Sequence, residues 1–212
     1  MSPTQPAATA TKLRMTVDEF WEFVNRPENA ERSFELRHGE VIELSRPTRL
    51  HGIVCYRIVF LLGQYAEKAG IGYVVSNDAG IVLEEEPGTV VGPDVAYFTD
   101  ATTFEDIPPK WAETPPVLAV EVLSPNDKPT AVNEKVQDYI QGGVKVVWVV
   151  DYEERKVSVC RHDRTAIVLK EDAELSGDPD LPGFTCRIAE FFRLPGQKPP
   201  PTPGRVTCRS FA

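Results

Sequence analysis

The sequence lacks any apolar run of the length that crosses a membrane. A spanning helix needs about 20 consecutive apolar residues, and no segment of the 212 residues approaches this length. Residues 1–11 also lack the apolar core of a secretory signal. These absences argue against a helical membrane protein and lead us to expect a cytoplasmic location.

Cysteine is scarce and scattered. The four cysteines are Cys55, Cys160, Cys186 and Cys208, and none forms a Cys-x-x-Cys pair. The three histidines, His38, His51 and His162, do not cluster with them along the chain. This spacing argues against a structural zinc site and against a disulfide framework. We expect ordinary reduced cysteines.

Basic residues are also fewer than acidic ones. The chain has 23 Lys and Arg against 32 Asp and Glu, which gives a formal net charge of −9. A protein that coats nucleic acid needs a surplus of basic residues, so this class is disfavoured. An enzyme that gathers carboxylates around a metal is locally acidic, however, and a homodimer can still present a local basic surface. The charge therefore leaves nucleic-acid enzymes open.

The length and composition of the chain predict one large domain. With 42% hydrophobic and 26% charged residues, a chain of this length should bury roughly 70% of the surface that its unfolded state exposes. We expect the domain to span residues 14–194. Residues 1–13 and the Pro-rich residues 195–212 are interpreted as disordered tails.

Two helices are predicted in the first half of the chain. Thr16 and Glu19 form a capping box that opens a helix over 17–24. Apolar residues recur at helical spacing over 52–69, and Gly70 follows as a stop signal.

Strand-like alternation predicts a hairpin over 33–37 and 40–44. Three further runs predict an antiparallel meander, at 73–75, 80–85 and 90–98. Alternating runs at 157–161 and 166–170 predict a second hairpin. Residues 184–192 are expected to form a closing segment that packs over the sheet.

The most informative pattern is a strand, a helix and a buried strand in succession. Residues 117–123 and 144–150 are nearly continuous apolar runs, and 130–141 has helical spacing. Two buried strands joined by a helix form a parallel βαβ unit. We therefore expect a mixed central sheet flanked by helices. Trp148, Tyr139 and Phe98 lie in the runs expected to form its core.

Two charged residues fall inside this apolar pattern. Glu121 sits in the middle of 117–123, where an unpaired carboxylate would cost several kcal/mol. A structural ion pair or a solvent-facing place on an edge strand would also explain it. Lys135 shares the apolar stripe of its helix with Val136 and Tyr139. Its stem should therefore point at the sheet, where its charge needs an acidic partner.

Asp94 supplies a second candidate acid. It follows Pro93 within the predicted strand 90–98, although Pro-Asp is also common in turns. Two acids on adjacent strands with a lysine above them suit metal-assisted hydrolysis of a phosphodiester. The carboxylates would bind Mg²⁺ or Mn²⁺, and Lys135 would orient the attacking water or help to deprotonate it, and stabilise the developing negative charge.

Several short motifs occur in a specific order. They are Gly92-Pro93-Asp94-Val95, Val120-Glu121-Val122-Leu123-Ser124-Pro125, Glu134-Lys135 and Val147-Trp148-Val149-Val150-Asp151. In this order and spacing, the chain over about residues 14–194 resembles the Uma-type restriction-endonuclease-like family, a branch of the PD-(D/E)XK nuclease superfamily. The resemblance implies the restriction-endonuclease-like α/β fold.

The same resemblance implies roles for particular residues. Asp94 and Glu121 would bind the metal, together with the backbone carbonyl of Val122. The superfamily's usual lysine position is occupied by Leu123, and in this branch the following helix supplies the lysine, here Lys135.

The resemblance further implies supporting roles for Glu35 and His51 near the metal. The simpler interpretation is that Glu35 faces outward on a hairpin and that His51 caps a helix. The family often has an aspartate one turn before the lysine, where this chain has Ala131.

The sequence thus favours a metal-dependent endonuclease that cuts DNA, acting as a homodimer. Because of Ala131 and the acidic composition, a non-catalytic binding or regulatory module with the same fold is the alternative.

Overall fold

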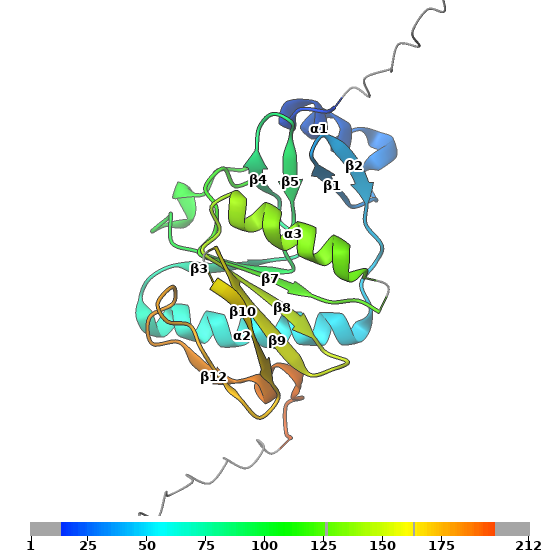
Figure 1. Ribbon diagram of the computed structural model, residues 1–212. Coiled ribbons are helices and arrows are strands. Elements are labelled where there is room, and N and C mark those ends of the chain that lie inside the picture. The colour runs from blue at the N-terminus through cyan, green and yellow to red at the C-terminus, as the bar shows by residue number, and fades with distance from the viewer. Residues whose placement is uncertain (1–13, 126, 163, 198–212) are drawn as a thin grey trace, which may run out of the picture.

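The computed structural model of the chain describes residues 14–125, 127–162 and 164–197 (Figure 1). Of the two tails expected from the sequence, residues 1–13 and 198–212 lie outside the described residues. The described chain contains a large sheet, a small sheet and a two-stranded ribbon.

The large sheet has six strands in the order β10-β9-β8-β7-β6-β3. Strands β7 and β8 are parallel, and every other neighbouring pair is antiparallel. The mixed sheet, its βαβ unit and the hairpin of β9 and β10 were all predicted, and these predictions are confirmed. The strands are β3 (Tyr73–Ser76), β6 (Val95–Phe98), β7 (Leu118–Val122), β8 (Val146–Asp151), β9 (Lys156–Arg161) and β10 (Arg164–Lys170).

Two long helices cover the large sheet, α2 (Arg49–Ala69) and α3 (Pro129–Gln141) (Figure 1). Alternate residues of β7 point to opposite faces of a sheet. Val120 accordingly packs in one apolar cluster with α2, whereas Ala119 packs in another with α3. The helices therefore lie on opposite faces of the sheet, so that both faces of its central strands are buried.

Helix α2 begins one turn earlier than the predicted start at residue 52. Thr48 is its N-cap, and the Thr48 hydroxyl accepts a hydrogen bond from the backbone N–H of His51 at 3.2 Å. Such a cap satisfies one of the donors left free at a helix start. His51 is therefore buried inside the first turn and is not the cap. The predicted stop at Gly70 is confirmed, since Gly70 has the left-handed conformation with φ of 66°.

The small sheet has the order β2-β1-β5-β4, and helix α1 (Val17–Val24) packs on it. The predicted hairpin of β1 and β2 and the capping box of α1 are confirmed. The strands are β1 (Phe34–Arg37), β2 (Glu40–Glu43), β4 (Ile81–Glu84) and β5 (Thr89–Val91).

Of the predicted meander, the antiparallel pairing of its second and third runs is confirmed, but the place of the first run beside the second and the single strand 90–98 were wrong. Strands β4 and β5 pair in the small sheet, whereas β3 and β6 pair in the large one. The chain leaves one sheet for the other at Gly92 and Pro93, because proline has no N–H to donate to a ladder. At Gly92, a Cβ would lie 2.4 Å from the carbonyl oxygen of Asp78, so this crossing requires glycine.

The C-terminal part closes over the face that α2 covers, as predicted. Phe184, Ile188 and Phe191 are buried in the same apolar cluster as α2 and the central strands. This part contains β11 (Glu174–Ser176), β12 (Thr185–Arg187) and the 3₁₀ helix η3 (Ile188–Phe192). Two further 3₁₀ helices are η1 (Pro27–Asn29) and η2 (Phe104–Asp106).

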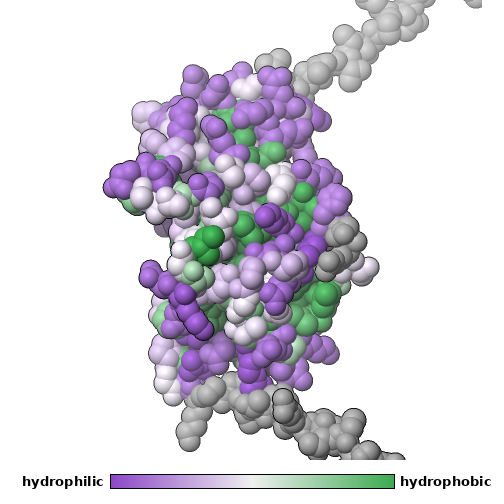
Figure 2. Space-filling view, turned by 90° about the vertical axis from the view of Figure 1, so that its left-hand side faces the viewer, coloured by the Kyte–Doolittle hydropathy of each residue, from purple (hydrophilic) through white to green (hydrophobic). Residues whose placement is uncertain are grey.

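The described residues also agree with the expectations for core and surface. Trp148, Tyr139 and Phe98 are buried. None of the described helices combines the length and the hydropathy that a membrane span requires. On the face drawn in Figure 2, hydrophilic residues dominate and apolar residues form small patches between them.

Candidate active site

A polar cleft of about 730 Å³ opens where both sheets meet the first turn of α2 and the side of α3. Carboxylates, a histidine, a lysine and backbone of the Gly92 crossing come together there. The candidate residues in its lining are His51, Asp78, Gly92, Asp94, Glu121, Val122 and Lys135. The three candidate catalytic residues, which are far apart in the sequence, therefore share one cavity.

Glu121 and Lys135 meet directly. Lys135 Nζ lies 3.0 Å from Glu121 Oε2, and the hydroxyl of Tyr139 donates a 2.6 Å hydrogen bond to Glu121 Oε1. Lys135 and Tyr139 are four residues apart on α3, so they lie on the same face of the helix. Each carboxylate oxygen of Glu121 therefore has a hydrogen-bond donor. The alternative that Glu121 faces solvent on an edge strand was wrong.

Glu35 is the second partner of Lys135. Its Oε1 lies 2.8 Å from Lys135 Nζ and accepts the backbone N–H of Gly92 at 3.0 Å. Only 4% of Glu35 is exposed, so the interpretation that it faces outward on the hairpin was wrong. Because Glu35 belongs to β1, this contact joins the small sheet to α3 and holds the lysine from both sides.

Asp94 lies just before β6, at the break between the two sheets. Its Oδ2 accepts the backbone N–H of Val122 at 2.7 Å, and its Oδ1 lies 3.1 Å from His51 Nε2. The register of β6 against β7 pairs Val95 with Val120. Asp94 is therefore carried to the end of β7 where Glu121 and Val122 lie.

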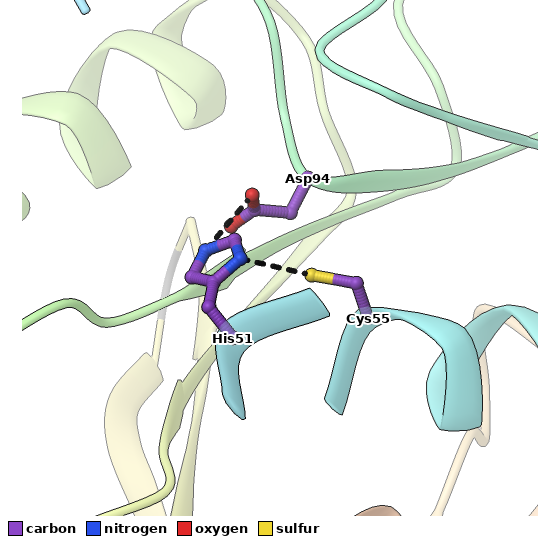
Figure 3. Close-up of side chains that lie close together, drawn as sticks. All are labelled: His51, Cys55 and Asp94. Carbon is purple, nitrogen blue, oxygen red and sulfur yellow. Dashed lines mark hydrogen bonds and ion pairs between the residues drawn. The ribbon is translucent and has the colours of Figure 1, made fainter. Parts of the chain in front are cut away.

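His51 connects Asp94 to a cysteine that the sequence did not point to. Its second ring nitrogen, Nδ1, lies 3.5 Å from Cys55 Sγ, so the imidazole stands between a thiol and a carboxylate (Figure 3). Cys55 lies four residues after His51 on α2, on the same side of the helix. That spacing was visible in the sequence, but it became informative only when the fold added Asp94.

The charges of the cluster change one another's pKa. Burial raises the pKa of Glu121 to about 7, with Lys135 opposing this shift and Asp94 adding to it. Burial lowers the pKa of Lys135, but the carboxylates of Glu121 and Glu35 outweigh it, and the pKa ends above its ordinary value. Lys135 is therefore a firmly protonated cation in this arrangement.

Asp78 is a candidate residue that sequence reasoning missed. It lines the cleft, and burial together with the negative charge of Asp94 raises its pKa. Asn77 and Asp78 both have positive φ, of 70° and 53°, which marks a tight turn. In the sequence an Asn-Asp pair between two strands indicates only a turn, so no signal distinguished Asp78 from other turn residues.

The pairing of His51 predicts a pH dependence of stability. The hydrogen bond with Asp94, followed by that with Cys55, raises the pKa of His51 from 6.5 to about 10. Stability from a raised pKa is complete below the unfolded value and is lost as the pH rises through the folded value. We therefore expect the free energy of unfolding to fall by about 2–5 kcal/mol between pH 6.5 and 10.

Urea denaturation at several pH values checks this expectation. The His51→Gln variant should lose clearly less stability over the same interval than the unchanged protein. Equal losses in the two proteins would contradict the assigned contact.

The chain was compared with known protein families and with curated proteins. Residues 19–189 match the Uma2 family, which is described as "Putative restriction endonuclease". The chain belongs to the Uma2 family. The comparison with curated proteins gave no match.

A solved structure has the same fold as this Uma2 chain. It is described as a "putative nuclease belonging to DUF820" from Anabaena variabilis, with 19% sequence identity and a TM-score of 0.71. The match covers 84% of this chain and 97% of the other. The predicted restriction-endonuclease-like fold and family are thereby confirmed.

Proposed function

We propose that this Uma2 protein is a metal-dependent endonuclease that hydrolyses phosphodiester bonds in DNA. The observation that carries the proposal is the convergence of Asp94, Glu121 and Lys135 on one polar cleft. The family description supports the nuclease class. The geometry of the cleft supports a hydrolytic role for these three residues in particular.

The donor atoms suit Mg²⁺ or Mn²⁺. Asp94 and Glu121 offer carboxylate oxygens, and Val122, whose carbonyl is the third proposed ligand, lines the same cleft. Hard cations of this size prefer oxygen ligands and keep several waters, for which the open cleft has room. Such a metal, when bound, would polarise the phosphodiester and lower the pKa of a bound water.

Lys135 would act as a cation in this reaction. A lysine whose pKa is raised by two carboxylates is a poor general base, which favours charge stabilisation over proton abstraction. Its Nζ would attract the phosphate and stabilise the negative charge that develops during attack. Glu35 would hold Lys135 in position independently of Glu121, because Lys135 Nζ contacts the two carboxylates separately.

His51 would orient Asp94. The carboxylate of Asp94 is held on one oxygen by the Val122 N–H and on the other by His51. Groups that hold a metal-binding carboxylate fix its direction and tune its affinity. His51 is thus a positioning residue in the proposal, and Glu35 has the same role toward Lys135.

We further propose a homodimer acting on DNA in the cytoplasm, since two copies of the site can cut both strands of a duplex. The alternative, a non-catalytic module, was motivated partly by Ala131. Residue 131 is exposed on α3, one turn before Lys135. The contacts among Glu35, Glu121 and Lys135 are therefore formed without that aspartate, which favours the enzyme.

Plasmid cleavage tests the proposal. We expect the purified protein to nick or linearise plasmid DNA with Mg²⁺ or Mn²⁺ and to be inactive with a chelator present. Asp94→Asn and Glu121→Gln should each reduce cleavage at least about 100-fold. Asp100→Asn is the matched control, because Asp100 lies beyond the other end of β6 and bonds only to the Tyr73 hydroxyl in the described chain.

Cleavage that persists in the Asp94 and Glu121 variants would rule out this site. Calorimetric titration with Mn²⁺ separates the alternative function, since a module without catalysis could lack metal binding altogether. Absence of both Mn²⁺ binding and cleavage of DNA or RNA would leave the non-catalytic module as the better description.

A further inference from the structure

A second set of metal-binding atoms lies beside the proposed magnesium ligands. His51, Cys55 and Asp94 each offer one ligand atom, and these three atoms lie within 4.8 Å of one another. Figure 3 shows the imidazole of His51 directed at the other two side chains. His51 and Cys55 lie four residues apart on one face of α2, and Asp94 lies just before β6.

The chemistry of this set differs from that of the magnesium site. Mg²⁺ takes oxygen ligands, whereas one nitrogen, one sulfur and one oxygen suit Zn²⁺ and other thiophilic divalent ions. Histidine and a second ligand at i and i+4 on a helix are a recurrent pair for zinc, because that spacing points both at one place. Cys55 is therefore the residue that changes the metal preference.

The spacing of the atoms also fits. Bond lengths of about 2.0 Å to nitrogen and oxygen and about 2.3 Å to sulfur place neighbouring atoms of a tetrahedral zinc site roughly 3.2–3.8 Å apart. The two contacts of His51 use different ring nitrogens, since Nδ1 lies 3.5 Å from Cys55 Sγ and Nε2 lies 3.1 Å from Asp94 Oδ1. One ion binds only one of these nitrogens, and with one atom taken from each residue the set lies within 4.8 Å. A rotation of the imidazole together with a shift of about 1 Å therefore closes the site.

We propose that His51, Cys55 and Asp94 form a site for Zn²⁺ or a similar thiophilic ion, with the fourth position left to water. Binding converts the Cys55 thiol to a thiolate and frees one nitrogen of His51, and the released protons pass to solvent. Asp94 belongs to both sites. An ion held by Cys55 therefore withdraws Asp94 from Mg²⁺ or Mn²⁺.

The consequence is an inhibitory metal site. Zinc is expected to suppress cleavage at concentrations far below those of the activating ion, because thiolate and imidazole bind it more tightly than Mg²⁺ binds carboxylates. This inhibitory consequence rests on the proposed nuclease function. The binding of the ion itself does not, since Glu121 and Lys135 take no part in it.

A simpler role for the three residues would be a hydrogen-bond chain that steadies Asp94. In such a hydrogen-bond chain Cys55 remains a thiol and binds no metal. The presence of a sulfur–metal bond therefore separates the two explanations. Cobalt reports that bond directly, because a thiolate bound to Co²⁺ gives a charge-transfer absorption in the near ultraviolet.

The experiment is a titration of the full chain with Co²⁺, followed by displacement with Zn²⁺. We expect one equivalent of Co²⁺ to produce the band, Zn²⁺ to abolish it, and Cys55→Ser to lack it. Cys160→Ser and Cys208→Ser are matched controls that should keep the band. His51→Gln should weaken Co²⁺ binding at least about tenfold, and circular dichroism should show that each variant is folded.

Glu121→Gln separates this proposal from the proposed function. It should keep the cobalt band while it loses cleavage, and a protein that cleaves no substrate should still show the band. In cleavage assays, Cys55→Ser should need at least about tenfold more Zn²⁺ for half inhibition. Absence of the band in the unchanged chain, or its persistence in Cys55→Ser, would overturn the proposed site.

Discussion

Replacing Lys135 with methionine is expected to reduce DNA cleavage by about 10²–10³-fold, which is the usual effect of removing one group that stabilises transition-state charge. Methionine keeps much of the stem's packing and removes only the cation. Kinetics of plasmid cleavage under saturating Mn²⁺ measure the effect. Lys145→Met is the control, because Lys145 is exposed in the turn after α3. A variant that retains more than about a tenth of the rate would contradict the assigned role.

The same substitution should destabilise the fold in a pH-dependent way. Lys135 lies between Glu35 and Glu121, so its loss leaves two buried carboxylates without a counter-charge. Removing one member of a buried ion pair costs about 3–5 kcal/mol. The pKa of Glu121, which burial already raises, should rise further, so the folded state binds more protons than the unfolded state. Stability is then lost as the pH increases.

Urea denaturation near pH 5 and near pH 8 tests that sign. The methionine variant should be closer to the unchanged protein at the lower pH, where protonation of Glu121 removes its unpaired charge. A larger deficit at the lower pH would contradict the buried pairing.

The second large effect is expected from the ion pair between Arg37 and Asp138. Arg37 donates to Asp138 Oδ2 from both Nε and Nη2, at 3.0 and 2.7 Å, and only 7% of the Asp138 side chain is exposed. His38 Nε2 also lies 3.1 Å from Asp138 Oδ1. Arg37→Met should reduce the free energy of unfolding by about 3–5 kcal/mol, because it leaves a buried carboxylate without its main partner.

An exposed pair elsewhere in the small sheet provides the matched control. Arg32 and Glu43 are also joined by two hydrogen bonds, but their side chains are 45% and 52% exposed. Arg32→Met should have a clearly smaller effect, because solvent screens an exposed pair. Equal effects of the two substitutions in urea denaturation would show that burial does not govern the strength of these pairs.

The Arg37 pair also bears on the cleft. Glu35 and Arg37 are two residues apart on β1, and their partners Lys135 and Asp138 are three residues apart on α3. Strand and helix are thus joined by two ion pairs of opposite polarity. We infer that Arg37 helps to hold α3 at the distance from the small sheet at which Lys135 reaches both of its carboxylates.

Much of the fold was predictable because its signals are local. Side chains alternate along a strand and repeat at 3.6 residues along a helix, so the βαβ unit around β7 and β8 could be recognised from its apolar pattern. Burial of Glu121 in such a run implied a partner, and Lys135 on the apolar stripe of the next helix was a suitable one. These two inferences needed only the period of each element.

The errors arose where pairing between distant segments decided the outcome. The run 90–98 has strand-forming residues on both sides of Gly92 and Pro93, and these two residues divide it between two sheets. Glu35 has the alternation of an exposed residue on a hairpin, but its carboxylate is buried against Lys135 of α3 and the backbone N–H of Gly92. In both cases the local pattern was compatible with two arrangements.

By itself, the sequence determined the order of helices and strands, the buried βαβ unit and the presence of charged residues that could not remain unpaired. Only the tertiary structure decided that Glu35 shares Lys135, that Asp78 borders the cleft, and that Cys55 joins His51 and Asp94. The physical reason is that periodicity reports which side of an element is buried. Contacts between side chains depend on how separate elements pack, which no single segment encodes.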